Sequence, residues 1–232
     1  MQQTTQSAPA PQAAKPKPPA PPPEFQEGNI ARMDAAALIR ILTDPGSPEF
    51  QKAKACQRIG ELGAKEAVPA LASLLGNERL STYARYGLEP IADSTADEAL
   101  RAALPKLKGD LLIGVINSIG KRRDAQASPA LAKMIYDADG NVARAAVAAL
   151  GNTGGVSSMK NLQAALARTE GMVRMAVADA VLLCAERLLA EGQRDQALAL
   201  YASLSAADMP KPTRLAAMYA IIREETSINR PR

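Results

Sequence analysis

The chain has 232 residues, a formal net charge of +4 and a pI near 9.1. Aromatic residues make up only 3% of a sequence that is 47% hydrophobic, and small aliphatic side chains favour closely packed helices over a sheet, so we predict an all-α fold. Histidine is absent, which excludes Ser-His-Asp and Cys-His catalytic sets, HExxH zinc sites and 2-His-1-carboxylate iron sites.

Charge and cysteine content exclude further classes of site. An excess of four positive charges over this length is too small for a nucleic-acid-binding surface. Cys56 and Cys184 are 128 positions apart and match no zinc or redox spacing. No apolar run approaches the roughly 18 residues of a membrane span. We therefore predict no metal, no cofactor and no transmembrane segment.

Residues 1–28 form a Pro- and Ala-rich segment. Eight of the first 23 residues are proline. Such a segment cannot bury enough surface to fold, and we expect a disordered leader or linker. A spacer of this kind fits a bacterial cytoplasmic protein and equally an exported, periplasmic one, so the compartment stays open.

From residue 29 onward, apolar residues recur at helical spacing with a period near 30. Gly60 and Gly120 are 60 positions apart, and Gly120 and Gly151 are 31 apart. A fixed period of this length indicates a stacked array of helix pairs. In each pair we expect the glycine to end the second helix, as in VAALGNTGG at 147–155, because glycine readily adopts the positive φ that closes a last turn.

Several helix boundaries are predicted from residue type. Ser128 is expected to cap a helix whose first residue is Pro129. Thr95 and Glu98 have the spacing of a capping box. Pro90 falls where a helix interior is expected, so that helix should kink or end early.

The second helices of the pairs align in columns of small, medium and large residues, which is typical of a stacked core. The columns are Ala55, Gly87, Val115 and Ala146; Cys56, Leu88, Ile116 and Val147; and Ile59, Ile91, Ile119 and Leu150. Cys184 lies in a similar apolar run. We expect both cysteines to be small buried hydrophobic residues.

The segment DADGNVARAAVAALGNTGG at 137–155 resembles HEAT repeats, particularly the bacterial phycobilin-lyase-like type, and GMVRMAVADAV at 171–181 is a weaker copy. The resemblance covers roughly residues 34–185 and implies an α-solenoid. We assign residues 29–185 to this array. Residues 188–204 resemble part of a tetratricopeptide unit, so we expect residues 186–232 to form a helical hairpin that caps the array before a disordered tail end. The whole is an α-solenoid of about six helical hairpins.

HEAT arrays offer a concave surface lined by the second helices, and this resemblance implies a non-catalytic scaffold for a protein or peptide partner. The candidate residues for this partner face are Lys54, Arg58, Glu61, Tyr86, Glu89, Asn117 and Lys121.

Two alternatives stay open. One is a HEAT-like enzyme or enzyme subunit, such as a bilin lyase, although no catalytic motif is found in the sequence. The other is weak nucleic-acid binding through the basic cluster at 121–123, with Lys106 and Lys108 nearby, which the overall charge does not favour.

Overall fold

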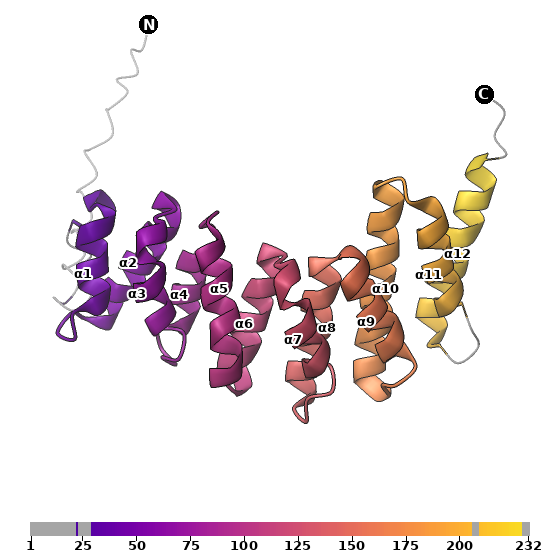
Figure 1. The fold of residues 1–232 in the computed structure, drawn as a ribbon, viewed down its shortest axis with the longest axis horizontal. Helices are drawn as coiled ribbons and strands as arrows, with labels where there is room; N and C mark the ends of the chain where they lie inside the picture. The colour runs from indigo at the N-terminus through magenta and orange to yellow at the C-terminus, as the bar shows by residue number, and fades with distance from the viewer. Residues whose placement is uncertain (1–21, 23–28, 206–208, 229–232) are drawn as a thin grey trace, which may run out of the picture.

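The computed structural model describes Pro22 and residues 29–205 and 209–228. The leader expected over residues 1–28 lies outside this part of the chain except for Pro22, and so does the end of the tail. The described residues form twelve α-helices in six consecutive pairs, with no strand among them (Figure 1).

The bounds of the paired helices are α1 (Ala35–Thr43) and α2 (Glu49–Leu62); α3 (Val68–Ser73) and α4 (Ser81–Leu88); α5 (Ser94–Ala103) and α6 (Gly109–Arg122); α7 (Ser128–Met134) and α8 (Gly140–Thr153); α9 (Gly155–Leu166) and α10 (Gly171–Ala190); and α11 (Arg194–Leu204) and α12 (Lys211–Ile228). Short 3₁₀ turns lie at Ile30–Arg32, Lys65–Ala67, Leu104–Lys106 and Ala125–Ala127.

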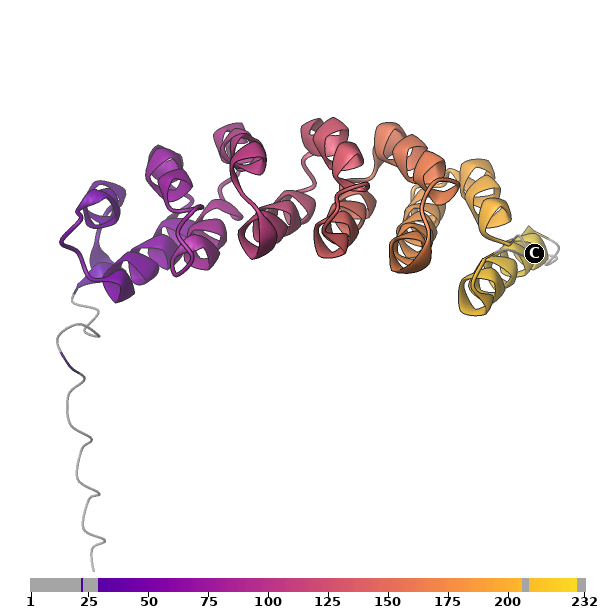
Figure 2. The same ribbon diagram turned by 90° about the horizontal axis from the view of Figure 1, so that it is seen from below.

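The helices form two layers of a gently curved arch. Figure 2 shows the odd-numbered helices along the outer side and the even-numbered helices along the inner, concave side. Each pair packs on the next: α2 contacts α4, α6 contacts α8, and α8 contacts α10. The predicted α-solenoid of six hairpins is confirmed.

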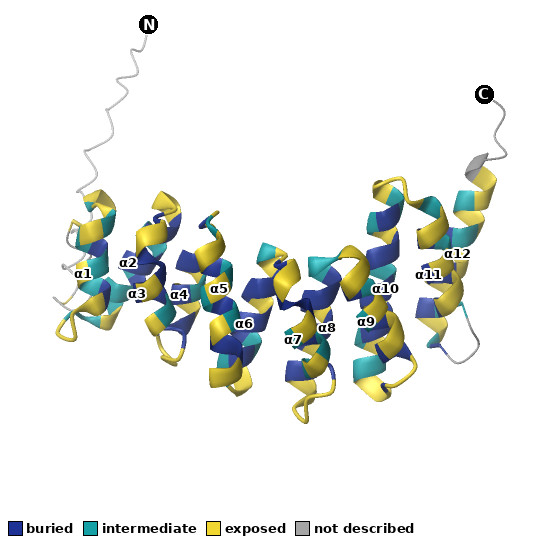
Figure 3. Ribbon diagram, in the orientation of Figure 1, coloured by how far each residue is buried: buried dark blue, intermediate teal, exposed yellow. Residues whose placement is uncertain are grey.

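The core runs along the whole array instead of gathering at one centre, as the buried residues in Figure 3 show. Every member of the three predicted columns is buried. Cys56, Ile116 and Val147 are fully inaccessible to solvent, and Cys184 is buried as predicted. The 3.6-residue periodicity therefore identified the core correctly.

The predicted helix-ending role is confirmed for Gly63 and Gly154, which end α2 and α8 at positive φ, but it is wrong for the glycines that recur with the period. Gly60, Gly120 and Gly151 lie inside α2, α6 and α8, not at their ends. A Cβ atom on Gly120 would lie 2.8 Å from the Cα atom of Ala149 on α8, closer than real Cβ atoms approach. These glycines are needed because neighbouring inner helices touch backbone to backbone at these points.

Two helix-start predictions also need correction. Thr95 and Glu98 form no capping box, because the Asp93 carboxylate caps α5 and accepts a hydrogen bond from the Thr95 N–H at 3.0 Å. Ser128 is the first residue of α7 and not its cap, and its buried hydroxyl lies 2.9 Å from that of Ser158. The expected early end before Pro90 is confirmed, since α4 stops at Leu88.

The C-terminal hairpin forms, but it begins later than expected. Helix α10 runs through the predicted boundary at 185/186 to Ala190, so the final hairpin is α11 and α12. Its last helix, α12, leaves several large apolar side chains exposed. Among the described residues, no helix is both long enough and apolar enough to span a bilayer.

Candidate partner-binding face

The seven predicted partner-face residues lie on three consecutive inner helices, α2, α4 and α6, or directly after α4. Four of them come together: Glu61, Tyr86, Glu89 and Lys121 line one groove of about 310 Å³, with Gly60 and Pro90 completing it. We call this set the Tyr86 groove.

The backbone at Gly60 and Pro90 makes the groove possible. A Cβ atom on Gly60 would lie 3.2 Å from both the Cγ atom of Pro90 and the carbonyl oxygen of Tyr86. The missing side chain therefore lets α2 and α4 approach closely and leaves the floor of the groove free. Because Pro90 ends α4 early, Glu89 lies at the end of that helix and its side chain turns toward α6.

Glu89 is held by two donors from α6. The Ser118 hydroxyl donates to Glu89 Oε1 at 2.8 Å, and the Lys121 ammonium donates to Oε2 at 2.6 Å. The hydrogen bond and charge of Glu89 raise the pKa of Lys121, so the ammonium stays protonated in the physiological range. Lys121 remains largely exposed while Glu89 is mostly covered. The groove thus presents a positive charge at its rim over a neutralised carboxylate.

The other predicted residues lie outside this groove. Arg58 forms an ion pair with Glu61 at 2.8 Å and so orients that carboxylate at the rim. Asn117 lines a neighbouring groove that also contains Lys121 and Asn152. Lys54 lies over the ring of Phe50, with its Nζ 5.6 Å from the ring centroid. Lys121 therefore separates two grooves on the inner face, and Lys54 belongs to neither.

The basic cluster at 121–123 does not form one basic surface. The Arg122 side chain is nearly buried, pairs with Asp97 at 2.6 Å, and donates to the carbonyl oxygens of Leu88, Glu89 and Ile91 at 3.0, 2.8 and 2.6 Å. Arg123 ends α6 in the left-handed conformation. Lys121 pairs with Glu89 and Arg122 holds the end of α4, so two of the three cations have partners within the fold. Arg123 is exposed and lines the neighbouring groove with Lys121.

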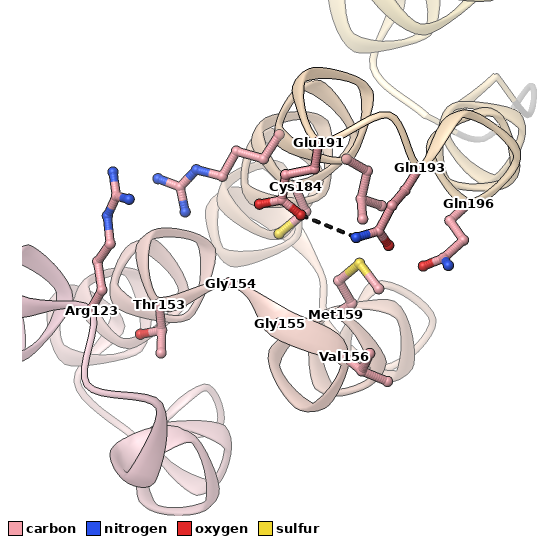
Figure 4. Close-up of a pocket in the computed structure, with 12 residues that line it drawn as sticks. Arg123, Thr153, Gly154, Gly155, Val156, Met159, Cys184, Glu191, Gln193 and Gln196 are labelled. Atoms are coloured by element: carbon pink, nitrogen blue, oxygen red, sulfur yellow. Dashed lines mark hydrogen bonds between the residues drawn. The ribbon is translucent and has the colours of Figure 1, made fainter.

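Sequence reasoning missed a cavity of about 170 Å³ between the α8–α9 turn, the end of α10 and the start of α11 (Figure 4). Gly154 and Gly155, both at positive φ, shape one wall. Arg187 donates at 2.7 Å to the carbonyl oxygens of both Gly151 and Asn152, and the Gln193 amide donates to Glu191 at 3.2 Å. The consecutive glycines were the only trace of this cavity in the sequence.

The chemistry of this cavity is that of a structural junction. Arg187 satisfies carbonyl groups at the end of α8, as Arg122 does for α4. Cys184 lines the cavity, but burial raises the pKa of its thiol and keeps it in the unreactive protonated form. Among the described residues, no three Cys, Asp or Glu side chains gather in a way that would hold a metal ion.

Comparisons with known proteins agree with this geometry. Residues 97–181, from α5 to α10, match the family described as HEAT repeats. A crystal structure of an engineered protein superposes with a TM-score of 0.50 at 17% identity, covering 84% of this chain and 98% of that one. At this identity the likeness shows the fold alone, which is that of a helical repeat protein.

Two further solved structures are similar at lower scores. A second engineered protein has a TM-score of 0.49 at 17% identity, covering 82% of this chain and 58% of its own. A designed armadillo repeat protein in complex with the peptide (KR)4 has a TM-score of 0.46 at 18% identity, covering 82% of this chain and all of its own. Among curated proteins, no sequence matches this chain.

Proposed function

Since this chain is a HEAT-repeat protein, we propose that it is a non-catalytic scaffold that binds a protein or peptide partner on the inner face of its arch, centred on the Tyr86 groove. The observation that carries this proposal is the exposure of Tyr86. In a chain with only five tyrosines, two phenylalanines and no tryptophan, Tyr86 is 55% exposed and lines a groove. Exposed tyrosines in grooves are typical anchors of protein interfaces.

The groove indicates the chemistry of the segment it would receive. Gly60, Pro90 and the Tyr86 ring supply an apolar floor, while Glu61 and Lys121 supply polar groups on opposite sides. An apolar side chain of the partner fits on the floor and removes the Tyr86 ring from water. Polar groups that flank it in the partner then meet the rim at Glu61 and Lys121.

The test begins with affinity capture by the full chain and identification of the captured protein by mass spectrometry. The purified partner is then titrated against Tyr86→Ala, which we expect to weaken binding by at least about tenfold. Tyr136→Ala is the matched control, because Tyr136 is also 48% exposed but lies beyond α7, away from the groove. We expect this control to bind as the wild type does.

Equal affinity of the two tyrosine variants would contradict the assignment of the partner to this groove. A bilin and duplex DNA, tested in the same titrations, separate the two alternative functions. Tight binding of either one that survives Tyr86→Ala would favour that alternative over the scaffold.

A further inference from the structure

Helix α12 carries an apolar stripe that no part of the described chain covers. Leu215, Met218, Tyr219 and Ile222 are between 44% and 69% exposed. Their spacing of three, one and three residues places all four on one side of the helix. We call these four residues the α12 stripe.

The α12 stripe lies opposite the side by which α12 joins the array. Thr213, Ala217 and Ala220 are buried, and the helix packs mainly on α11. The inner helix α8, by contrast, has α6 on one side and α10 on the other. The stripe is therefore the surface that a further layer of helices would cover, and an exposed apolar surface of this kind marks an interaction site.

We propose that the α12 stripe binds the α12 stripe of a second copy of this chain, with the two helices antiparallel. A twofold axis between Met218 and Tyr219 places Leu215 opposite Ile222 of the second copy and reciprocally. All four stripe residues then pack against each other, because the stripe is nearly symmetric about its centre. The stripe therefore fits itself without any change in the helix.

Charge selects the antiparallel arrangement. Lys211 begins α12 and Glu225 lies near its end, and both are exposed. At 100° per residue, the two side chains lie along the same edge of the stripe. Antiparallel pairing brings Lys211 of each copy beside Glu225 of the other, whereas parallel pairing puts the two Lys211 residues at the same end of the contact, far from Glu225. Two ion pairs thus favour the antiparallel dimer over the parallel one.

The size of the contact predicts a weak dimer. A helix of 18 residues is about 27 Å long, so one pair of helices buries less than the ~1,200 Å² of the smallest stable interfaces. We therefore expect a dissociation constant in the micromolar range, on the order of 10 μM.

Sedimentation velocity of the full chain, from about 1 to 200 μM, tests this proposal. We expect a concentration-dependent dimer that Ile222→Arg weakens by at least about tenfold, because a charge replaces both apolar contacts between Ile222 and Leu215 of the other copy. Leu62→Arg is the control: Leu62 is 42% exposed at the end of α2, and its substitution should leave the dimer unchanged. Circular dichroism confirms that each variant keeps its helices.

A charge exchange tests the arrangement itself. Lys211→Glu or Glu225→Lys alone should weaken the dimer by about threefold at low salt, because each removes two exposed ion pairs and creates two repulsions. The double exchange should restore the wild-type affinity. A chain that stays monomeric at 200 μM, a dimer indifferent to Ile222→Arg, or a double exchange that fails to restore affinity would each overturn the antiparallel α12 dimer.

Discussion

The middle of the array and its C-terminal end use the same kind of helix in different ways. In the middle, α8 packs on α6 and α10, and residues on both of its sides are buried. At the end, α12 packs mainly on α11 and leaves the α12 stripe exposed. Since each pair in a solenoid is stabilised only by its neighbours, this difference shows that burial of an inner helix depends on the pair that follows it.

Arginine side chains make the contacts of the middle specific. Arg122 of α6 reaches back to the end of α4, and Arg187 of α10 reaches back to the end of α8. The last carbonyl groups of a helix have no partners within it, and each arginine supplies donors to them from the next pair. The middle pairs are thus linked by partly buried polar contacts as well as by apolar packing.

The largest loss of stability is predicted for Arg122→Ala. This change removes the partner of Asp97 and one donor to each of three carbonyl groups at and after the end of α4, of which, among the described residues, only that of Leu88 keeps a second donor, the Ile91 N–H. We expect the free energy of unfolding to fall by about 4 kcal/mol, measured by urea denaturation. Lys121→Ala is the control, because its ammonium is exposed and pairs only at the surface, so the expected loss is below about 1 kcal/mol. Equal losses would show that Arg122 is not a structural link.

The second prediction concerns the close contact of α6 with α8. Gly120→Val places a Cβ atom about where the Ala149 backbone lies, so the two helices must separate. We expect the free energy of unfolding to fall by about 3 kcal/mol. Gly140→Val is the matched control, because a Cβ atom there meets nothing within 4 Å. If both valine variants unfold at the same urea concentration, the helices do not depend on this contact.

The sequence predicted the buried columns correctly but the role of Gly60, Gly120 and Gly151 incorrectly, and the reason is physical. Burial follows the helical period, so the column of Cys56, Leu88, Ile116 and Val147 was recognised from spacing alone. A glycine that ends a helix and a glycine that lets two helices touch recur with the same period. Only the position of the neighbouring backbone distinguishes them.

Part of the candidate face could also be predicted from the helical period. The periodicity placed Glu61, Tyr86 and Lys121 on the side away from the core, and the structure brings them to one groove. The closeness of α2 and α4 at Gly60, which shapes the groove, depends on packing across pairs. The structural role of Arg122 was missed because its partners are carbonyl groups, which every residue has and no sequence pattern marks.

A third prediction compares α2, near the start of the array, with α10, near its end, by the labelling rates of their cysteines. Cys56 on α2 is fully buried, and burial raises the pKa of its thiol from 9.0 to about 12. Cys184 on α10 borders the cavity beside α11. We expect iodoacetamide at pH 8 to label Cys184 about tenfold faster than Cys56 in the native protein, because a smaller local opening exposes it.

The raised pKa of the Cys56 thiol also makes the stability of the fold depend on pH. Because folding raises the pKa of Cys56, the folded state holds its proton more tightly than the unfolded state does. The contribution of the protonated Cys56 thiol to the free energy of unfolding is therefore complete below pH 9 and is lost as the pH rises toward 12. Cys56→Ser, used as a probe control, leaves Cys184 as the only thiol. Faster labelling of Cys56 than of Cys184 would contradict the expectation that α10 opens locally more easily than α2.

The smallest change in the free energy of unfolding is predicted at the turns that end α2 and α6, which have the same backbone conformation but different residues. Gly63 ends α2 at φ 62° and Arg123 ends α6 at φ 55°, and in both turns two N–H groups donate to equivalent carbonyls, those of Gly60 and Ile59 or of Gly120 and Ile119. A side chain in the left-handed region is strained, whereas glycine is not. Arg123→Gly should therefore raise the free energy of unfolding by about 0.5–1 kcal/mol in urea.

Arg123→Ala separates the two effects of that substitution, because it removes the guanidinium but keeps the Cβ atom at positive φ. We expect the alanine variant to be about 1 kcal/mol less stable than the glycine variant. If instead both variants lose stability equally, the arginine side chain itself holds the turn through its position beside the cavity. The difference in the free energy of unfolding between the alanine and glycine variants thus measures the backbone strain at the end of α6. It does so independently of the arginine side chain, which both variants lack.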